Sequence, residues 1–450
     1  MEQPGFEPGV TGGKAGPLGI LACGGPLPLE VAEAGRRQGR AIHIVAIDGF
    51  ASPEVTRFPH ETVSLGQLGR MLASFKRAGV AEMVIAGAMQ RPNLLRLKVD
   101  WGFFRHLPKV LALTKGGDDS VLRRVIRFFE GEGLTVVGAG DVAPELLAPA
   151  GAIAARPPSL AQGEAMARAA RLIAALGRYD MGQGVVAGPD GIVAVEGTRG
   201  TDAMLRDLGP GGVNEGLGRG AVLVKLAKPG QEMRIDLPTI GPETVRRADA
   251  AGLAGIGVGA GAAIVLERAR LASEADAAGL FVIGLDAASV GASEAEPTAG
   301  IAPGEAGLDV AVKLQVVARR APTPADRRDI AIGRQLMGVV RAHGAGRAAI
   351  VSREHVLAVS GRLPLPAFVA AQGRPASWGR RAVRGRLGVV VVDGSDLDQV
   401  LDAALFRAAM QSGIAGLVLL GPLPEGDRRR EIVAWADEAG VFLMAAEPRP

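Results

Sequence analysis

Cysteine is almost absent from this chain of 450 residues, which contains only Cys23. A single cysteine excludes an intramolecular disulfide and a cysteine-rich zinc site. Aromatic residues are also scarce, at 4%. They do not alternate with basic residues as on nucleic-acid platforms, so we expect no nucleic-acid partner. No run approaches the roughly 20 apolar residues that a membrane-spanning helix needs.

A secretory signal is also missing from the beginning of the chain. Residues 1–16 are polar and rich in glycine and proline, without a basic region followed by an apolar one. We expect them to form a flexible tail, and we expect the protein to be cytoplasmic. The net charge of +4 permits anionic partners such as phosphate or a lipid surface, but it selects none of them.

Aliphatic residues and glycine are abundant instead. The chain is 48% hydrophobic and holds 65 glycines, a composition typical of α/β layers joined by tight strand–helix turns. The length predicts roughly two to four domains. We therefore expect a multidomain α/β protein.

The first expected domain covers residues 17–151. Short apolar strands alternate there with helices, which predicts a Rossmann-like domain with a mostly parallel sheet. Gly24 and Gly25 follow the first strand, at the strand end where such sheets bind ligands. The turn lacks the GxGxxG spacing, so a purely structural turn is equally compatible. The missing spacing also counts against a nucleotide-dependent oxidoreductase.

The second expected domain, residues 163–286, follows a linker at 148–162 and contains the most polar loop of the chain, within residues 222–242. Apolar residues 221–224 predict a buried strand, and Pro229 and Pro238 exclude a continuous helix after it. The loop then places six polar side chains within twelve positions: Lys225, Lys228, Gln231, Glu232, Arg234 and Asp236. Such residues suit a phosphorylated ligand with a divalent cation. The alternative is a solvated loop with surface ion pairs.

A third segment, residues 325–447, follows a linker at 289–307 and repeats features of the second domain. Residues 275–281 match 436–442, and residues 252–255 match 413–416 at the same offset. We interpret the segment as a degenerate duplicate of 163–286, with chance similarity as the alternative. Opposite 225–241 we place 386–402, which has neither the Lys-Ala-Lys-Pro start nor the Asp-x-Pro end of the loop.

Arginines gather within residues 362–386 of this third segment, where no acidic residue interrupts them. Such a stretch fits an anionic membrane surface or, as the alternative, a solvated basic face.

Several strings of the first two domains together resemble one family, the LpxI-type UDP-2,3-diacylglucosamine pyrophosphatases of lipid A biosynthesis. The resemblance covers about residues 16–286. The strings that carry it are residues 19–28, 66–69, 87–92, 117–119, 180–183, 200–205 and 224–242.

This resemblance implies a two-domain cytoplasmic or membrane-peripheral enzyme that binds a UDP-linked glycolipid between its domains. It implies hydrolysis of UDP-2,3-diacylglucosamine to 2,3-diacylglucosamine 1-phosphate (lipid X) and UMP, with Mg²⁺ or Mn²⁺. A homo-oligomer and peripheral contact with the inner membrane are left open.

The resemblance and the charges together give a set of expected site residues. The expected catalytic residues are Asp236, Lys225, Lys228, Arg234 and Gln231, with Asp236 as metal ligand or as the group that orients water. The expected substrate-binding residues are Gly24, Gly25, Arg91, Asp118, Gln183, Glu196, Gly200, Thr201 and Asp202. The two glycine-containing turns would offer backbone N–H donors to phosphate.

Three positions depart from the family pattern. Arg199 stands where the family generally has an acid, Glu232 stands where it has Asp, and Gly259 lies in a string that usually contains a glutamate. Arg199 and Gly259 favour an alternative, a non-catalytic relative that binds a sugar nucleotide or glycolipid and uses the third segment as an interaction module. Glu232 is a milder change. The retained charges of the loop favour the enzyme.

Overall fold

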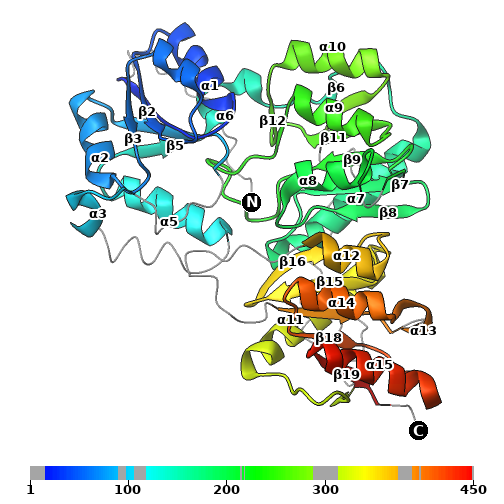
Figure 1. Ribbon diagram of the computed structural model, residues 1–450. Coiled ribbons are helices and arrows are strands. Elements are labelled where there is room, and N and C mark those ends of the chain that lie inside the picture. The colour runs from blue at the N-terminus through cyan, green and yellow to red at the C-terminus, as the bar shows by residue number, and fades with distance from the viewer. Residues whose placement is uncertain are drawn as a thin grey trace, which may run out of the picture. The chain divides into compact units, whose positions relative to one another are not determined.

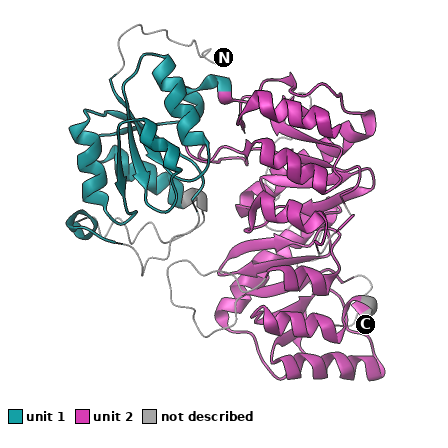
Figure 2. Ribbon diagram, turned by 45° about the horizontal axis from the view of Figure 1, so that its top comes forward, with its two compact units in different colours: residues 1–116, 120–145 teal, residues 117–119, 146–450 magenta. Residues whose placement is uncertain are grey.

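The computed structural model describes residues 16–89, 98–105, 118–212, 215–216, 218–286, 313–372, 388–394 and 397–447. The chain divides into two compact units, residues 1–116 with 120–145 and residues 117–119 with 146–450 (Figure 2). Most of the expected tail, the whole linker at 289–307 and residues 373–387 of the arginine-rich stretch lie outside the described residues.

The first unit is built on a five-stranded sheet in the order β3-β2-β1-β4-β5, with every neighbouring pair parallel. This order confirms the expected Rossmann-like sheet, in which the chain changes direction between β1 and β4. The strands are β1 (Leu18–Ala22), β2 (Ile42–Ile47), β3 (His60–Val63), β4 (Glu82–Ala86) and β5 (Thr135–Val137). The helical segments are α1 (Leu27–Arg37), η1 (Pro53–Arg57), α2 (Leu68–Arg77), α3 (Trp101–Arg105), α5 (Asp118–Glu130), α6 (Ala139–Val142) and η3 (Pro144–Leu146).

The second module contains a six-stranded sheet in the order β6-β13-β11-β9-β7-β8. Figure 1 labels β6, β11, β9, β7 and β8 of this sheet. Its central strands β9, β11 and β13 are parallel, whereas β6, β7 and β8 each run antiparallel to a neighbour. The strands are β6 (Gly151–Ala152), β7 (Gly184–Gly188), β8 (Gly191–Val195), β9 (Val222–Lys225), β11 (Gly255–Gly259) and β13 (Phe281–Leu285). The other elements are α7 (Leu160–Leu176), η4 (Gly177–Tyr179), α8 (Gly200–Leu208), β10 (Thr239–Ile240), α9 (Pro242–Ala250), β12 (Ile264–Val265) and α10 (Arg268–Ala278).

The expected linker at 148–162 contains regular structure. Strand β6 pairs with β13, and α7 begins at Leu160 because Ser159 and Gln162 form a capping box before it. The end of the linker is therefore the first turn of a helix.

The third module repeats this plan in the order β14-β19-β18-β17-β15-β16. An antiparallel edge strand, three parallel strands and an antiparallel hairpin follow one another in both sheets. The strands are β14 (Leu314–Val316), β15 (Ala348–Ser352), β16 (His355–Val359), β17 (Val389–Val392), β18 (Gly416–Leu419) and β19 (Phe442–Ala446). The helices are α11 (Pro324–Ala342), α12 (Leu365–Gln372), α13 (Leu397–Val400), α14 (Ala403–Gln411) and α15 (Gly426–Ala439). The common order supports the duplication, which stays a proposal.

Strand register corrects one detail of the expected repeat. Val222 pairs with Gly255 in one sheet, and Val389 pairs with Gly416 in the other. The residue that corresponds to Lys225 is therefore Val392 and not a residue near 386. The offset changes because 226–241 separate β9 from α9, whereas the shorter segment 393–402 separates β17 from α14.

Among the described residues, no helix is both long enough and apolar enough to cross a bilayer.

Candidate functional site

The polar residues of the second module collect at one edge of its sheet. Lys225 ends β9, Gln183 directly precedes β7, and Glu196 directly follows β8. Because β7 is antiparallel to both β8 and β9, these three positions lie at the same edge. It is the edge where the parallel strands have their carboxyl ends, and open α/β sheets bind ligands there.

Lys225 is buried, with 8% of its surface exposed. Its Nζ donates to the carbonyl oxygen of Thr239 at 3.3 Å. In the part of the chain that the structure describes, no carboxylate pairs with this ammonium group. A buried cation without a counter-charge is costly. The position therefore suits an anion that arrives with a ligand.

Asp236 is held by two side-chain amides. Its Oδ2 accepts from Gln231 Nε2 at 2.8 Å and from Gln183 Nε2 at 3.0 Å. Gln231 is itself buried, and its Oε1 accepts from the backbone amide of Lys228 at 2.7 Å. That bond leaves the NH₂ group of Gln231 facing Asp236. These two neutral hydrogen-bond donors fix the orientation of the Asp236 carboxylate.

Lys228 forms an ion pair that sequence reasoning did not anticipate. Its Nζ lies 2.6 Å from Oδ1 of Asp180, which comes directly after η4. Asp180 has a left-handed backbone, with φ of 51°. Non-glycine residues in this region are uncommon and often mark functional sites. The available signal was the acid in the string 180–183, to which no role was given.

Arg234 and Glu232 form a two-pronged ion pair in the loop. Arg234 Nε lies 2.9 Å from Glu232 Oε1, and its second prong reaches Oε2 at 3.0 Å. Arg234 is one of the expected catalytic residues, and its guanidinium group is of the type that binds phosphate. Its charge is balanced by Glu232 here, so a phosphate would have to share or displace that partner.

Glu196 carries a buried carboxylate oxygen, Oε2, that has no hydrogen-bond partner. Gly184 lies against it, and a Cβ at that position would come within 2.5 Å of the same oxygen. An unsatisfied buried oxygen is unusual in a folded protein. Glu196 therefore remains a candidate to bind a cation or to accept a hydrogen bond from the substrate.

The turn after β1 contributes less than expected. The amide of Gly24 donates to the carbonyl of Ala88 at 2.8 Å, and the amide of Ala88 donates back to Gly24 at the same distance. The Gly24 donor is thus occupied by the neighbouring strand end. Within this turn, the expected substrate contact is left to Gly25.

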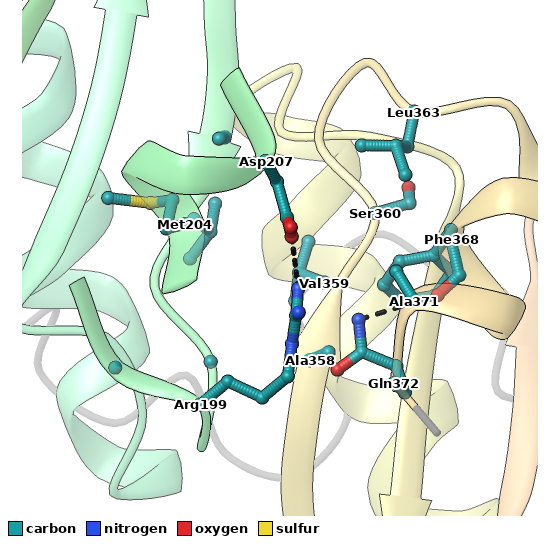
Figure 3. A pocket seen from close by; sticks show the side chains of 14 residues that line it. Arg199, Met204, Asp207, Ala358, Val359, Ser360, Leu363, Phe368, Ala371 and Gln372 are labelled. Atoms are coloured by element: carbon teal, nitrogen blue, oxygen red, sulfur yellow. Dashed lines mark hydrogen bonds and ion pairs between the residues drawn. The ribbon is translucent and has the colours of Figure 1, made fainter. Parts of the chain in front are cut away.

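The turn at Gly200 lines a small pocket beside the third module (Figure 3). Arg199 and Asp207 both line it and form an ion pair with each other. The cavity measures about 40 Å³, far below the volume that holds a ligand of nucleotide size. The pocket itself therefore cannot receive the substrate.

The two residues after Gly200 lie in different environments. Thr201 is buried, and its Oγ1 has no hydrogen-bond partner. The Oδ1 of Asp202 lies 3.7 Å from Nε of Arg247 on α9. Their roles in substrate binding stay predictions.

Two expected site residues cannot be placed. Arg91 lies outside the described residues, and Asp118 begins α5 but its side chain is outside the described part.

The acidic residues do not form a metal cage of their own. Among the described residues, no group of three or more His, Cys, Asp or Glu side chains could hold an ion. Mg²⁺ is often bound by one or two carboxylates together with substrate phosphates. The Asp236 carboxylate and the orphaned Glu196 oxygen are donors of the type this mode uses.

Cys23 is not suited to act as a nucleophile. Burial raises the pKa of its thiol to about 11, so the thiol stays protonated near neutral pH. Only the thiolate is strongly nucleophilic.

The fold is that of an α/β protein, and polar side chains gather at the sheet edge where such folds bind ligands. Residues 17–146 match the LpxI N-terminal domain and residues 149–283 match the LpxI C-terminal domain. The chain belongs to the LpxI family. It is similar to the UDP-2,3-diacylglucosamine pyrophosphatase LpxI of Caulobacter vibrioides, with 38% identity over 272 residues. That alignment covers 60% of this chain and 97% of the relative.

The third module is an addition to this family pattern. The matched family domains end at residue 283, and 97% of the relative is accounted for by 272 aligned residues. The relative therefore has no room for a segment of the size of 313–447.

Proposed function

We propose that the protein hydrolyses the diphosphate of UDP-2,3-diacylglucosamine to 2,3-diacylglucosamine 1-phosphate and UMP. In this reaction a water oxygen forms a bond to phosphorus, and the bond from that phosphorus to the bridging oxygen breaks. The two protons of water end on the two products or in solvent. The family membership and the name of the similar Caulobacter protein support the choice of substrate.

The observation that carries the proposal is the burial of Lys225 without a described carboxylate partner. A diphosphate would supply the missing negative charge at the carboxyl edge of the parallel strands. Hydrolysis of a phosphoric anhydride depends mainly on such charge neutralisation and on positioning, since it needs little covalent chemistry from the protein.

Asp236 is the group we assign to the attacking water. Its hydrogen bonds from Gln183 and Gln231 fix its direction, and a fixed carboxylate can accept a hydrogen bond from water. Mg²⁺, when bound with the diphosphate, would supply charge neutralisation at the phosphate oxygens, with Asp236 and Glu196 as its protein ligands. Lys228 would bind a phosphate oxygen while it remains close to Asp180.

The direct test measures UMP release from UDP-2,3-diacylglucosamine by the purified protein, with and without Mg²⁺. We expect Asp236→Asn to lower kcat by about 10²- to 10³-fold, the size of effect seen when one transition-state contact is removed. Asp249→Asn makes the same change on an exposed position of α9 and should leave kcat unchanged.

Two results would contradict parts of the proposal. A folded wild-type protein that releases no UMP would disprove the enzymatic function. If that protein still binds the substrate, the non-catalytic relative becomes the correct interpretation, which Arg199 and Gly259 favour. Equal activity of Asp236→Asn and wild type would remove only the role of Asp236.

A further inference from the structure

The second and third modules meet through equivalent edge strands, β8 and β16 (Figure 1). Two backbone hydrogen bonds join them. The amide of Thr198 donates to the carbonyl of Leu357 at 3.0 Å, and the amide of Arg362 donates to the carbonyl of Val193 at 3.0 Å. Thr198 corresponds to Arg362 and Val193 corresponds to Leu357, because both hairpins repeat with the same spacing. The two hydrogen bonds are therefore equivalent to each other when the two modules are exchanged.

The glycines beside these hydrogen bonds make the same reciprocal contacts. A Cβ at Gly197 would lie 2.6 Å from the carbonyl oxygen of Leu357. A Cβ at the corresponding Gly361 would lie 2.4 Å from the carbonyl oxygen of Val193. Backbone atoms cannot move aside as a flexible side chain can, so both modules need glycine at the same place.

Helices α7 and α11 complete the contact beneath the strands. They bury corresponding residues in one shared apolar cluster, which continues from the second module into the third. The corresponding pairs are Leu172 with Leu336, Ile173 with Met337, and Leu176 with Val340. Contacts in which residue i meets j while the equivalent of j meets the equivalent of i are the signature of a twofold axis.

We propose that residues 313–447 occupy the place of a second copy of the second module. The surface formed by β8 and α7 is then a homodimer surface that the third module of the same chain covers. Two further observations support this occupant. An uncovered β8 would expose the unpaired backbone groups of an edge strand, which proteins generally protect. The Caulobacter relative lacks the third module, so it has no internal partner for this edge.

The test compares the mass in solution of the full chain with that of a chain ending at residue 300. The shorter chain contains both domains found in the relative, which consists of little else. By sedimentation equilibrium at micromolar concentration, we expect one chain of 46.1 kDa for the full protein and two copies for the shorter one.

A matched pair of variants identifies the surface. In the shorter chain, Gly197→Ala should reduce association at least tenfold, because the new Cβ meets a backbone carbonyl. Gly188→Ala lies in the same hairpin with only ordinary contacts at 3.7 Å or more, and its association should be unchanged. A folded shorter chain that stays single, or that pairs equally well with Gly197→Ala, overturns the proposal.

A second route applies if the shorter chain does not fold. Leu336→Glu in the full chain places a charge in the buried face of α11 and should release the third module from the surface. The mass should then double, and the added change Gly197→Ala should return it to one chain. A folded Leu336→Glu protein that remains single also overturns the proposal.

Discussion

The second and third modules share a backbone but differ in the side chains at one sheet edge. Asp180 corresponds to Gly344, and both have left-handed backbones, with φ of 51° and 58°. Lys225 corresponds to Val392, which lies in an apolar cluster. The backbone plan thus persists where glycine and valine replace Asp180 and Lys225.

Two further positions extend the contrast. Glu196, with its unsatisfied oxygen, corresponds to Ser360, whose Oγ accepts from the backbone amides of Arg347 and Ala348. Gln183, which holds Asp236, corresponds to Arg347. Among the described residues, the third module has no buried side-chain polar atom without a hydrogen-bond partner, whereas the second has such atoms at Glu196 and Thr201. That difference is best explained by a ligand at the second module only.

The largest effects should follow from exchanging Lys225 and Val392. Lys225→Val should lower kcat by about 10²- to 10³-fold, because the charge that faces the diphosphate is lost. Its stability should be equal to or higher than that of the wild type, because a buried ammonium group has been removed. UMP release and thermal unfolding measure the two quantities.

The reverse exchange supplies the contrast. Val392→Lys places an unpaired charge in an apolar cluster and should cost about 3–5 kcal/mol of unfolding free energy. A stable Val392→Lys protein would show that the fold tolerates a lysine at this position without a ligand. A Lys225→Val protein that unfolds would show that the fold itself needs Lys225.

A smaller effect is expected at Asp180. Asp180→Gly removes the ion pair with Lys228 and should lower kcat/KM on the order of tenfold, the scale of one charge-assisted hydrogen bond. Glycine accepts the left-handed backbone, so the melting temperature should fall little. Gly344→Asp should do the opposite, with unchanged activity and a stability loss of about 1–2 kcal/mol. Equal behaviour of the two variants would argue against a ligand-related role for Asp180.

The smallest effect concerns Asp329 in α11, which corresponds to Ala165 in α7. Asp329 accepts from the amides of Arg353 and Glu354 in the β15–β16 turn, and burial raises the pKa of its carboxyl above 3.8. A raised folded-state pKa gives stability that is present below pH 3.8 and is lost as pH rises through the folded value. Wild type should therefore lose stability over this range relative to Asp329→Asn. Urea unfolding from pH 3 to 7 measures the difference, and parallel curves would refute it.

Much of the fold could be predicted because strands and helices leave local patterns. The apolar run at 18–22 and the Pro229 and Pro238 interruptions indicated strand and loop correctly. The repeat was readable from paired glycine and phenylalanine positions. Its register was not readable, because the loop after Lys225 is longer than its counterpart in the third module. The offset taken from residues 252–281 therefore placed residue 386 opposite Lys225, whereas the strand pairing places Val392 there.

The site was less accessible from the sequence. Charge type predicted that Lys225 and Asp236 belong to one loop, but not that two amides hold Asp236 or that Glu232 balances Arg234. The occupied amide of Gly24 depends on Ala88, which is distant in sequence. Partners of this kind are set by tertiary packing, and a single sequence gives no spacing rule for them.

The joining of β8 to β16 within one chain has a consequence for dosage. An assembly of separate copies dissociates on dilution, whereas tethered partners face each other at a high effective concentration however few molecules are present. The contact at Thr198 and Arg362 is therefore maintained at any expression level. Each such pair also carries a fixed ratio of one loop with lysine and arginine to one counterpart, residues 393–402, without either, and no mixing of copies can alter that ratio.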